Sequence, residues 1–120
     1  MQNSPKDLYK KLFGKNGEDL ALKTLKKRGY KLLERNYRTK FAEADLILEK
    51  DKIIVFAEVK SRSGDKFGTP AEAVTSVKQN RYRKLAEFYL SENGIFGAPI
   101  SFLVAEVYKD GRVNIIENAF

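Results

Sequence analysis

The chain has 120 residues, a length suited to one domain, with 42% hydrophobic residues, a net charge of +7 and neither cysteine nor histidine. The two absences exclude thiol nucleophiles, zinc fingers and imidazole bases. Any catalysis must therefore use carboxylates, lysines, hydroxyls or an oxygen-liganded metal ion such as Mg²⁺. Neither a signal peptide nor an apolar run of about 18 residues is present, which predicts a cytoplasmic protein without membrane contact.

The positive charge is concentrated in the first third of the chain. Residues 1–40 hold 12 Lys or Arg and 4 Asp or Glu, whereas residues 41–120 hold 11 and 12. Such a lopsided basic surface favours a polyanionic partner, most often nucleic acid. A solvated surface that only improves solubility has the same composition, so charge alone leaves both interpretations open.

The first predicted helix covers residues 16–28 of a single domain that spans 1–120. Asn16 is a suitable N-cap, Asp19 stands in the reciprocal capping position, and Gly29 is placed to close the helix after a basic last turn. Residues 1–13 are predicted to form a flexible basic N-terminus. One face of the helix has the spacing i, i+3, i+4, i+7 and carries Glu18, Ala21, Leu22 and Leu25.

Three extended segments follow the helix. We predict an edge strand at 30–38 and two further strands at 43–49 and 52–60, with the sequence EKDK as the turn between the last two. The strand at 52–60 is apolar on both faces, which is typical of the interior of a sheet. The polar loop at 61–68 is long enough to contact a ligand.

The remaining chain predicts a long helix and a hairpin. The sequence TPAE at 69–72 is a strong helix start, and SENG at 91–94 ends the helix near Glu92. Strands at about 99–108 and 112–117 are joined by KDGR, whose Asp-Gly pair favours a tight turn. The order α-β-β-β-α-β-β predicts an α/β or α+β fold with helices packed on a sheet. The predicted inner face of the second helix is formed by Val74, Val77, Leu85, Phe88 and Tyr89.

Three charged residues stand in or beside the core-forming strands: Asp45, Glu58 and Lys60. Burying a charge is costly unless the charge is paired or bound to an ion. Glu58 and Lys60 share one face of their strand, and Glu18 is an acid on the packed face of the first helix. These acids are predicted to converge on one cation, although an inert lysine–carboxylate pair near a strand end has the same spacing.

This prediction depends on the register of the hairpin. If the turn is centred on Lys50 and Asp51, Asp45 faces Phe56, and Glu58 lies on the diagonal about 7 Å away. Two carboxylates at that separation can share a cation. A three-residue turn would move Asp45 to the opposite face and separate the two acids.

Several motifs occur in a fixed order over residues 14–90. They are GEDLALKTLKKRGYKLLERNYR, VFAEVKSR and FGTPAEAVTSVKQNRYRKLAEFYL, and NAF ends the chain. Together they resemble the YraN family of bacterial proteins described as endonucleases, whose fold is like that of restriction endonucleases and Holliday-junction resolvases. Ala42 stands where the family has a glycine, a change expected to restrict the backbone or narrow the cleft.

The resemblance implies a restriction-endonuclease-like mixed central sheet flanked by helices, and an active site. Asp45, Glu58 and the carbonyl of Val59 would hold one or two Mg²⁺ or Mn²⁺ ions, with Glu18 as a further ligand, direct or through water. Lys60 would position the attacking water or offset charge on the phosphate. The implied catalytic residues are Glu18, Asp45, Glu58 and Lys60.

A second set of residues is expected to contact nucleic acid. Arg38 and Arg62 flank the proposed site, and Lys78 matches a lysine that recurs in the family. Further along the helix, basic residues could meet phosphates and an aromatic ring could stack on a base, although a solvated helix face has a similar composition. These helix residues are Arg81, Tyr82 and Lys84.

Three functions remain open from the sequence. The leading one is a metal-dependent endonuclease that acts on DNA rather than RNA, including branched or single-stranded forms, and the resemblance allows a homodimer. The second is a catalytically inactive nucleic-acid-binding module of the same fold. The third is a small protein-interaction domain whose carboxylates form surface ion pairs. Metal-dependent cleavage separates the first two, and absence of nucleic-acid binding at low salt would indicate the third.

Overall fold

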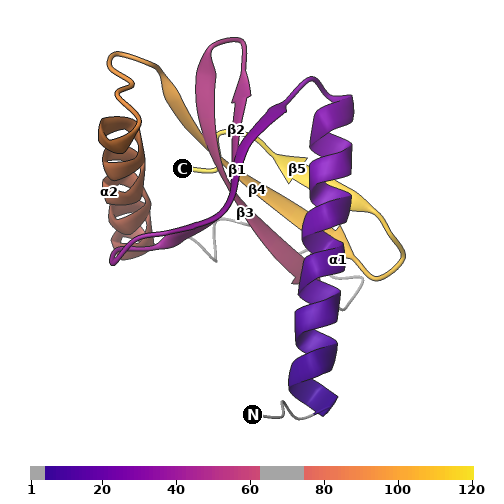
Figure 1. Cartoon of the computed structure of the whole chain (residues 1–120). Coiled ribbons are helices and arrows are strands. Elements are labelled where there is room, and N and C mark those ends of the chain that lie inside the picture. The colour runs from indigo at the N-terminus through magenta and orange to yellow at the C-terminus, as the bar shows by residue number, and fades with distance from the viewer. Residues whose placement is uncertain (1–4, 63–74) are drawn as a thin grey trace.

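The computed structural model of this chain describes residues 5–62 and 75–120, with side chains described for 16–62 and 75–120. Within these ranges the predicted order α-β-β-β-α-β-β is confirmed (Figure 1). No helix in the described part of the chain is long and apolar enough to cross a bilayer. The elements are α1 (Pro5–Lys27), β1 (Lys31–Arg38), β2 (Glu43–Lys50), β3 (Ile53–Arg62), α2 (Ser76–Glu92), β4 (Ile100–Tyr108) and β5 (Val113–Ile116).

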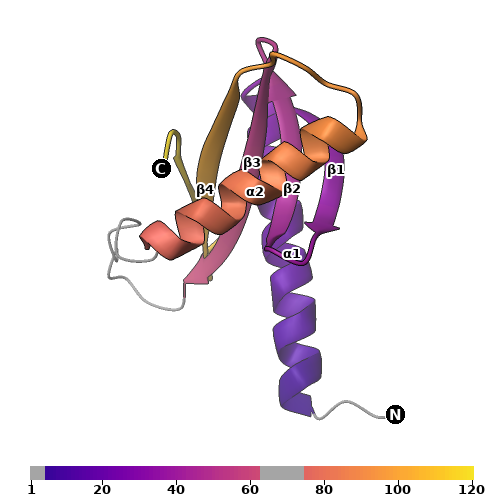
Figure 2. The same ribbon diagram turned by 90° about the vertical axis from the view of Figure 1, so that its left-hand side faces the viewer.

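The strands form one mixed sheet in the spatial order β1-β2-β3-β4-β5. Strands β3 and β4 are parallel and the other neighbours are antiparallel. Helix α2 connects the parallel pair and crosses one face of the sheet, while α1 covers the other face (Figures 1 and 2). Strand β3 is therefore central and covered on both faces, which explains its continuous apolar sequence. The predicted mixed sheet flanked by helices is confirmed.

Each face of the sheet has its own core. On the α1 side, the helix residue Leu25 packs with Leu46, Val55 and Leu103. On the α2 side, Leu85, Ala86 and Tyr89 pack with strand residues that include Ile47, Phe56 and Phe102. Alternate residues of β3 thus contribute to opposite cores, as side-chain alternation along a strand requires.

The inner face of α2 differs in part from the prediction. Leu85 and Tyr89 are buried as predicted, but Val77 is 58% exposed and Phe88 is 50% exposed. The buried residues Tyr82, Leu85, Ala86 and Tyr89 follow i, i+3, i+4, i+7, and this stripe turns Val77 and Phe88 away from the sheet. Val74 lies outside the described residues.

The helix starts also differ from the prediction. Helix α1 begins at Pro5, so Asn16 lies inside the helix rather than at its cap, and the predicted flexible segment is helical from Pro5 onward. Proline is favourable in the first helical turn because its missing N–H has no partner there. The predicted start at Thr69 lies outside the described residues. The described part of α2 is capped by Thr75, whose Oγ1 accepts a hydrogen bond from the Lys78 N–H at 3.2 Å.

The predicted end of α1 is confirmed. Gly29 has a φ of +93°, a conformation that glycine adopts without steric cost. The Tyr30 N–H donates to the Leu25 carbonyl at 3.1 Å, and the Gly29 N–H donates to the Lys26 carbonyl at 3.1 Å. This pair of bonds is the Schellman arrangement that ends many helices.

The β2–β3 hairpin has a two-residue turn at Asp51 and Lys52, whose φ values are 52° and 67°. Two consecutive residues with positive φ are typical of a tight hairpin turn. Phe56 consequently pairs with Ile47, so the predicted pairing of Phe56 with Asp45 is wrong by two residues. A shift of two does not by itself move a side chain to the other face, so the predicted proximity of Asp45 and Glu58 does not depend on this error.

Candidate active site

Strands β2 and β3 part at Asp45. Their ladder runs from Lys50↔Ile53 to Leu46↔Ala57. Beyond it, the Val59 N–H donates to Asp45 Oδ2 at 2.7 Å, so a side chain takes the place of a backbone acceptor. Because the N–H and C=O of one residue point to the same edge of a strand, the Val59 carbonyl also points into this gap.

The alternation of side chains is interrupted at the same place. Ala44 packs in the α2-side core, whereas Leu46, two residues later, packs in the α1-side core. On β1, the position opposite Asp45 is held by Asn36, which has a φ of 53°. Asp45 therefore lies between the two faces of the sheet and can interact with groups from both.

Three acids act on one another across this gap. Burial raises the pKa of Asp45 from 3.8 to about 6, the Val59 N–H opposes this shift, and the charges of Glu18 and Glu58 add to it. Glu18 comes from the α1 side and Glu58 from the α2 side. The predicted carboxylates thus lie near enough for the charges of Glu18 and Glu58 to act on Asp45, although these two acids come from opposite faces of the sheet.

A glycine in α1 lets Glu18 approach. A Cβ atom at Gly17 would lie 3.2 Å from Ser61 Oγ and 3.9 Å from Val107 Cβ. The helix therefore packs closely against β3 and β4 at the position just before Glu18. In the sequence this glycine is recognisable only as part of a family motif, because a close approach depends on tertiary packing.

The basic partner of Glu18 was not predicted. Arg35 Nη2 on β1 lies 2.9 Å from Asp19 Oδ1 and 3.6 Å from Glu18 Oε1. The second distance is too long for a hydrogen bond. Glu18 Oε1 is buried and has no hydrogen-bond partner among the described residues.

Glu58 is held on one side only. Lys78 Nζ donates to Glu58 Oε1 at 2.8 Å, but Oε2 is buried and lacks a hydrogen-bond partner within the described ranges. A buried carboxylate oxygen without a partner is costly, and oxygens of this kind are the ligands that Mg²⁺ prefers. The donor chemistry of Asp45, Glu58 and the Val59 carbonyl therefore fits a hard cation. In 5–62 and 75–120, however, no group of three acids stands in positions to ligate a metal.

Two lysines lie on the Glu58 side of the gap. Lys60 is half-buried on β3, and burial lowers its pKa, an effect that the charge of Glu58 opposes and that Lys78 reinforces. Lys60 and Glu58 share a face of β3, as predicted. Lys78, predicted to contact nucleic acid, instead neutralises Glu58 in this structure.

Two predicted nucleic-acid contacts have other roles in the structure. Arg62 Nε donates to Glu106 Oε2 at 3.0 Å, so its charge is used within the fold. Tyr82 is 5% exposed and packs against Phe102 and Phe120, which leaves its ring no open face for a base. Burial, and then the charges of Glu58 and Asp45, raise the pKa of the Tyr82 hydroxyl. This hydroxyl lies near the two acids but does not satisfy Glu58 Oε2.

The other predicted contacts lie on the surface. Arg38 is ion-paired with Glu43 at 2.9 Å, and its side chain is 76% exposed. Arg81 and Lys84 are exposed on α2 and line a hollow with Phe41. Ala42 lines the adjoining hollow, and it is not one of the described residues with positive φ, so the loss of the family glycine does not strain the backbone there.

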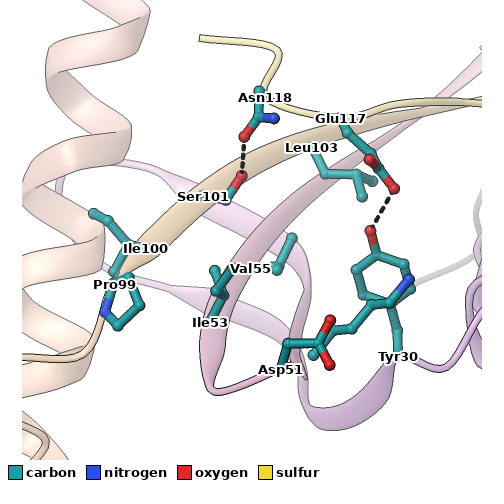
Figure 3. A pocket seen from close by; sticks show the side chains of 11 residues that line it. Tyr30, Asp51, Ile53, Val55, Pro99, Ile100, Ser101, Leu103, Glu117 and Asn118 are labelled. Carbon is teal, nitrogen blue, oxygen red and sulfur yellow. Dashed lines mark hydrogen bonds between the residues drawn. The ribbon is translucent and has the colours of Figure 1, made fainter.

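A separate hollow of about 280 Å³ lies at the opposite end of the sheet (Figure 3). The Tyr30 hydroxyl there donates to Glu117 Oε1 at 2.9 Å, and burial, followed by Glu117, raises the pKa of Tyr30 to about 12. Ser101 Oγ donates to Asn118 Oδ1 at 2.9 Å. These polar groups satisfy one another, and we therefore place the candidate chemistry at the Asp45 gap.

Comparisons with known proteins identify the family. A model described as uncharacterised protein family UPF0102 matches residues 17–117. The chain is 48% identical over 107 residues to a UPF0102 protein of Syntrophomonas wolfei subsp. wolfei, covering 87% of this chain and 93% of the relative. It is 40% identical over 118 residues to one of Caldicellulosiruptor saccharolyticus, covering 94% and 100%. With one of Clostridium perfringens strain ATCC 13124 it shares 46% over 117 residues, covering 93% and 96%. The chain therefore belongs to the UPF0102 family, which its motifs indicated under the name YraN.

Proposed function

We propose that this protein is a metal-dependent endonuclease that hydrolyses phosphodiester bonds in DNA with branched or single-stranded segments. The observation that carries the proposal is the pair of carboxylates at the gap between β2 and β3. Asp45 has a raised pKa beside other acids, and Glu58 keeps a buried oxygen without a partner within the described ranges. A divalent cation would remove both costs at once.

The chain offers a set of oxygen ligands for such an ion. Asp45, Glu58 and the Val59 carbonyl would hold one or two Mg²⁺ or Mn²⁺ ions, with Glu18 joined directly or through water. When bound, the cation supplies Lewis acidity that polarises the phosphate and makes water nucleophilic near neutral pH. Asp45 must lose its proton to take part, and a cation beside it favours the charged form.

The lysines would handle the negative charge of the substrate. Lys60 lies on the same face as Glu58, where its ammonium would offset charge that builds on the phosphate in the transition state. Lys78 Nζ lies 2.8 Å from Glu58 Oε1 and neutralises its charge. With substrate bound, Lys78 would exchange this contact for a phosphate oxygen.

The test is cleavage of labelled branched and single-stranded DNA in Mg²⁺. We expect Glu58→Ala to lower the rate about a thousandfold, because a lost metal ligand removes several kcal/mol of transition-state stabilisation. Lys60→Ala should lower it about a hundredfold. Glu87→Ala, which removes an exposed acid from α2, serves as the matched control and should leave the rate unchanged. Equal rates for all four proteins would refute the proposal.

A second candidate is a nucleic-acid-binding module without turnover. The Lys78–Glu58 ion pair favours it, because an internal ammonium already neutralises the acid that would ligate the metal. So does the lack of a three-acid ligand cluster in the part of the chain that the structure describes. This candidate predicts salt-sensitive DNA binding that EDTA does not change, with no cleavage by any variant.

A further inference from the structure

We propose that Phe41, flanked by Lys40 and Lys84, is a stacking platform for an unpaired base of the nucleic-acid substrate. This inference rests on the proposed function and narrows it. A strand that reaches the Asp45 gap would have to present at least one base outside a duplex, so the substrate is a single-stranded segment or the unpaired part of a branched molecule.

Phe41 stands beside the candidate active site. It lies in the turn between β1 and β2, and two hollows of about 540 and 440 Å³ share Phe41, Val77 and Arg81 in their walls. The second hollow is also lined by Lys78, whose ammonium contacts Glu58. The two hollows therefore adjoin at these shared residues, and we refer to them together as the groove; its nearer end reaches Lys78, the ion-pair partner of Glu58.

The turn that carries Phe41 is fixed by its own hydrogen bonds. Thr39 Oγ1 accepts from the Phe41 N–H at 3.0 Å and from the Ala42 N–H at 3.3 Å. The Thr39 N–H donates to the Ala42 carbonyl at 2.9 Å. A ring on a pre-formed turn loses little conformational freedom on binding, which favours a recognition role.

The surroundings of the ring suit a polyanion with flat bases. Lys40 Nζ and Lys84 Nζ lie 5.3 and 5.4 Å from the centre of the Phe41 ring, and Arg81 is exposed nearby. Phe41 is half-buried. A cation–π contact near the surface is weaker than a base–aromatic stack. A base can therefore displace the ammonium groups from the ring, and these can then pair with the phosphates on either side.

One acid in the groove could oppose this assignment. Glu43 lines the hollow nearer the active site, but it is ion-paired with Arg38 at 2.9 Å. Its charge is therefore balanced, and the basic residues of the groove set its sign. Val77, 58% exposed, adds apolar surface beside the ring. Bases inside a duplex cannot reach such a ring because they are already stacked, so the groove selects unpaired ones.

The experiment measures binding in EDTA, where no cleavage can occur. The probes are a labelled single-stranded oligonucleotide, an abasic strand of the same length and charge, and an intact duplex. We expect Phe41→Ala to weaken binding of the base-containing strand about tenfold and of the abasic strand less than twofold. Phe96→Ala, which removes an 86% exposed ring in the α2–β4 connection, is the matched control and should change neither.

A second variant reads stacking directly. The chain has no tryptophan, so Phe41→Trp adds a single indole whose fluorescence a stacked base should quench. The base-containing strand should quench it, whereas the abasic strand and poly-glutamate should not. Three results would each overturn the inference. They are equal weakening of the binding of both strands by Phe41→Ala, equal quenching by all three ligands, and no binding of the base-containing strand. Base-dependent quenching without Mg²⁺-dependent cleavage would leave the platform standing and refute the nuclease. Cleavage without base-dependent quenching would do the reverse.

Discussion

Glu106 and Glu58 are acids on neighbouring strands, and their environments differ in an instructive way. Glu106 is 1% exposed, yet Oε2 accepts from Arg62 and Oε1 accepts from Asn114, both at 3.0 Å. The Glu58 side chain is 18% exposed, and its buried Oε2 has no hydrogen-bond partner among the described residues. The more deeply buried acid is the better satisfied one.

The difference separates a structural acid from a candidate ligand. Burial of a charge is stable when donors occupy its oxygens, and Glu106 meets this condition within the fold. Glu58 meets it for one oxygen only, which leaves the other available to the cation that we propose. Depth of burial alone would indicate Glu106 as the functional residue, whereas the lack of a hydrogen-bond partner for one carboxylate oxygen indicates Glu58.

The largest effect on stability is expected when the satisfied acid loses its cation. Arg62→Met would leave Glu106 buried with neutral donors only, and we expect the free energy of unfolding to fall by about 3 kcal/mol. Urea denaturation measures this change. Arg38→Met, which removes an arginine that is 76% exposed in its ion pair with Glu43, is the control and should cost less than about 0.5 kcal/mol. Similar losses for both variants would show that Glu106 does not depend on Arg62.

At the candidate site, removing a charge is expected to raise the free energy of unfolding rather than lower it. Because the folded protein holds the pKa of Asp45 near 6, above the ordinary 3.8, the folded chain keeps a proton that the unfolded chain has lost between about pH 4 and pH 6. Ionisation of Asp45 therefore weakens the fold as pH rises through this window, and Asp45→Asn avoids that loss. After allowance for the partial exposure of Asp45, the variant should gain about 1–2 kcal/mol over the wild type between pH 4 and pH 7.

The comparison is made by urea denaturation at both pH values. Glu87→Gln, an exposed acid on α2, is the control and should show no growing difference from the wild type. Addition of Mg²⁺ at pH 7 should stabilise the wild type much more than Asp45→Asn, because a neutral amide oxygen is a weaker ligand than a carboxylate. A wild type that Mg²⁺ does not stabilise would count against the metal site while leaving the pH effect intact.

The parts of the site that the sequence predicted depend on rules that tolerate small errors. Asp45 and Glu58 were placed together by side-chain alternation, which depends only on whether the turn has an even number of residues. The turn lies at Asp51 and Lys52, one residue later than predicted, so the register shifts by an even number of residues. The interruption of the alternation at Asp45 itself was not predicted. The α1 end at Gly29 was found for a similar reason, since a left-handed closing residue has a local signature.

The parts that the sequence missed depend on contacts between distant segments. The gap at Asp45 lies opposite Asn36, which has a left-handed conformation that no local sequence pattern predicts. Gly17 matters because of Ser61, far along the chain. The sequence predicts that Arg62 contacts a phosphate, but in the fold it pairs with Glu106 on β4. Local patterns cannot distinguish an arginine that is free from one that the fold uses.

The smallest expected effect is the one that most sharpens the contrast between the two acids. Lys78 neutralises Glu58 as Arg62 neutralises Glu106. The Lys78–Glu58 pair is more exposed, with side-chain exposures of 31% and 18%, and Tyr82 lies beside it. If Lys78 only stands in for a divalent cation, Lys78→Met should bind Mg²⁺ about tenfold more tightly than the wild type, a change of about 1.4 kcal/mol. Calorimetric titration measures this. Lys84→Met removes an equal charge from the solvent-exposed part of α2 and should change the affinity less than twofold.

If Lys78→Met instead destabilised the fold as strongly as Arg62→Met and left Mg²⁺ binding unchanged, Glu58 would be a second structural acid. The distinction between the two acids would then disappear, because both would be satisfied by a lysine or arginine of the same chain.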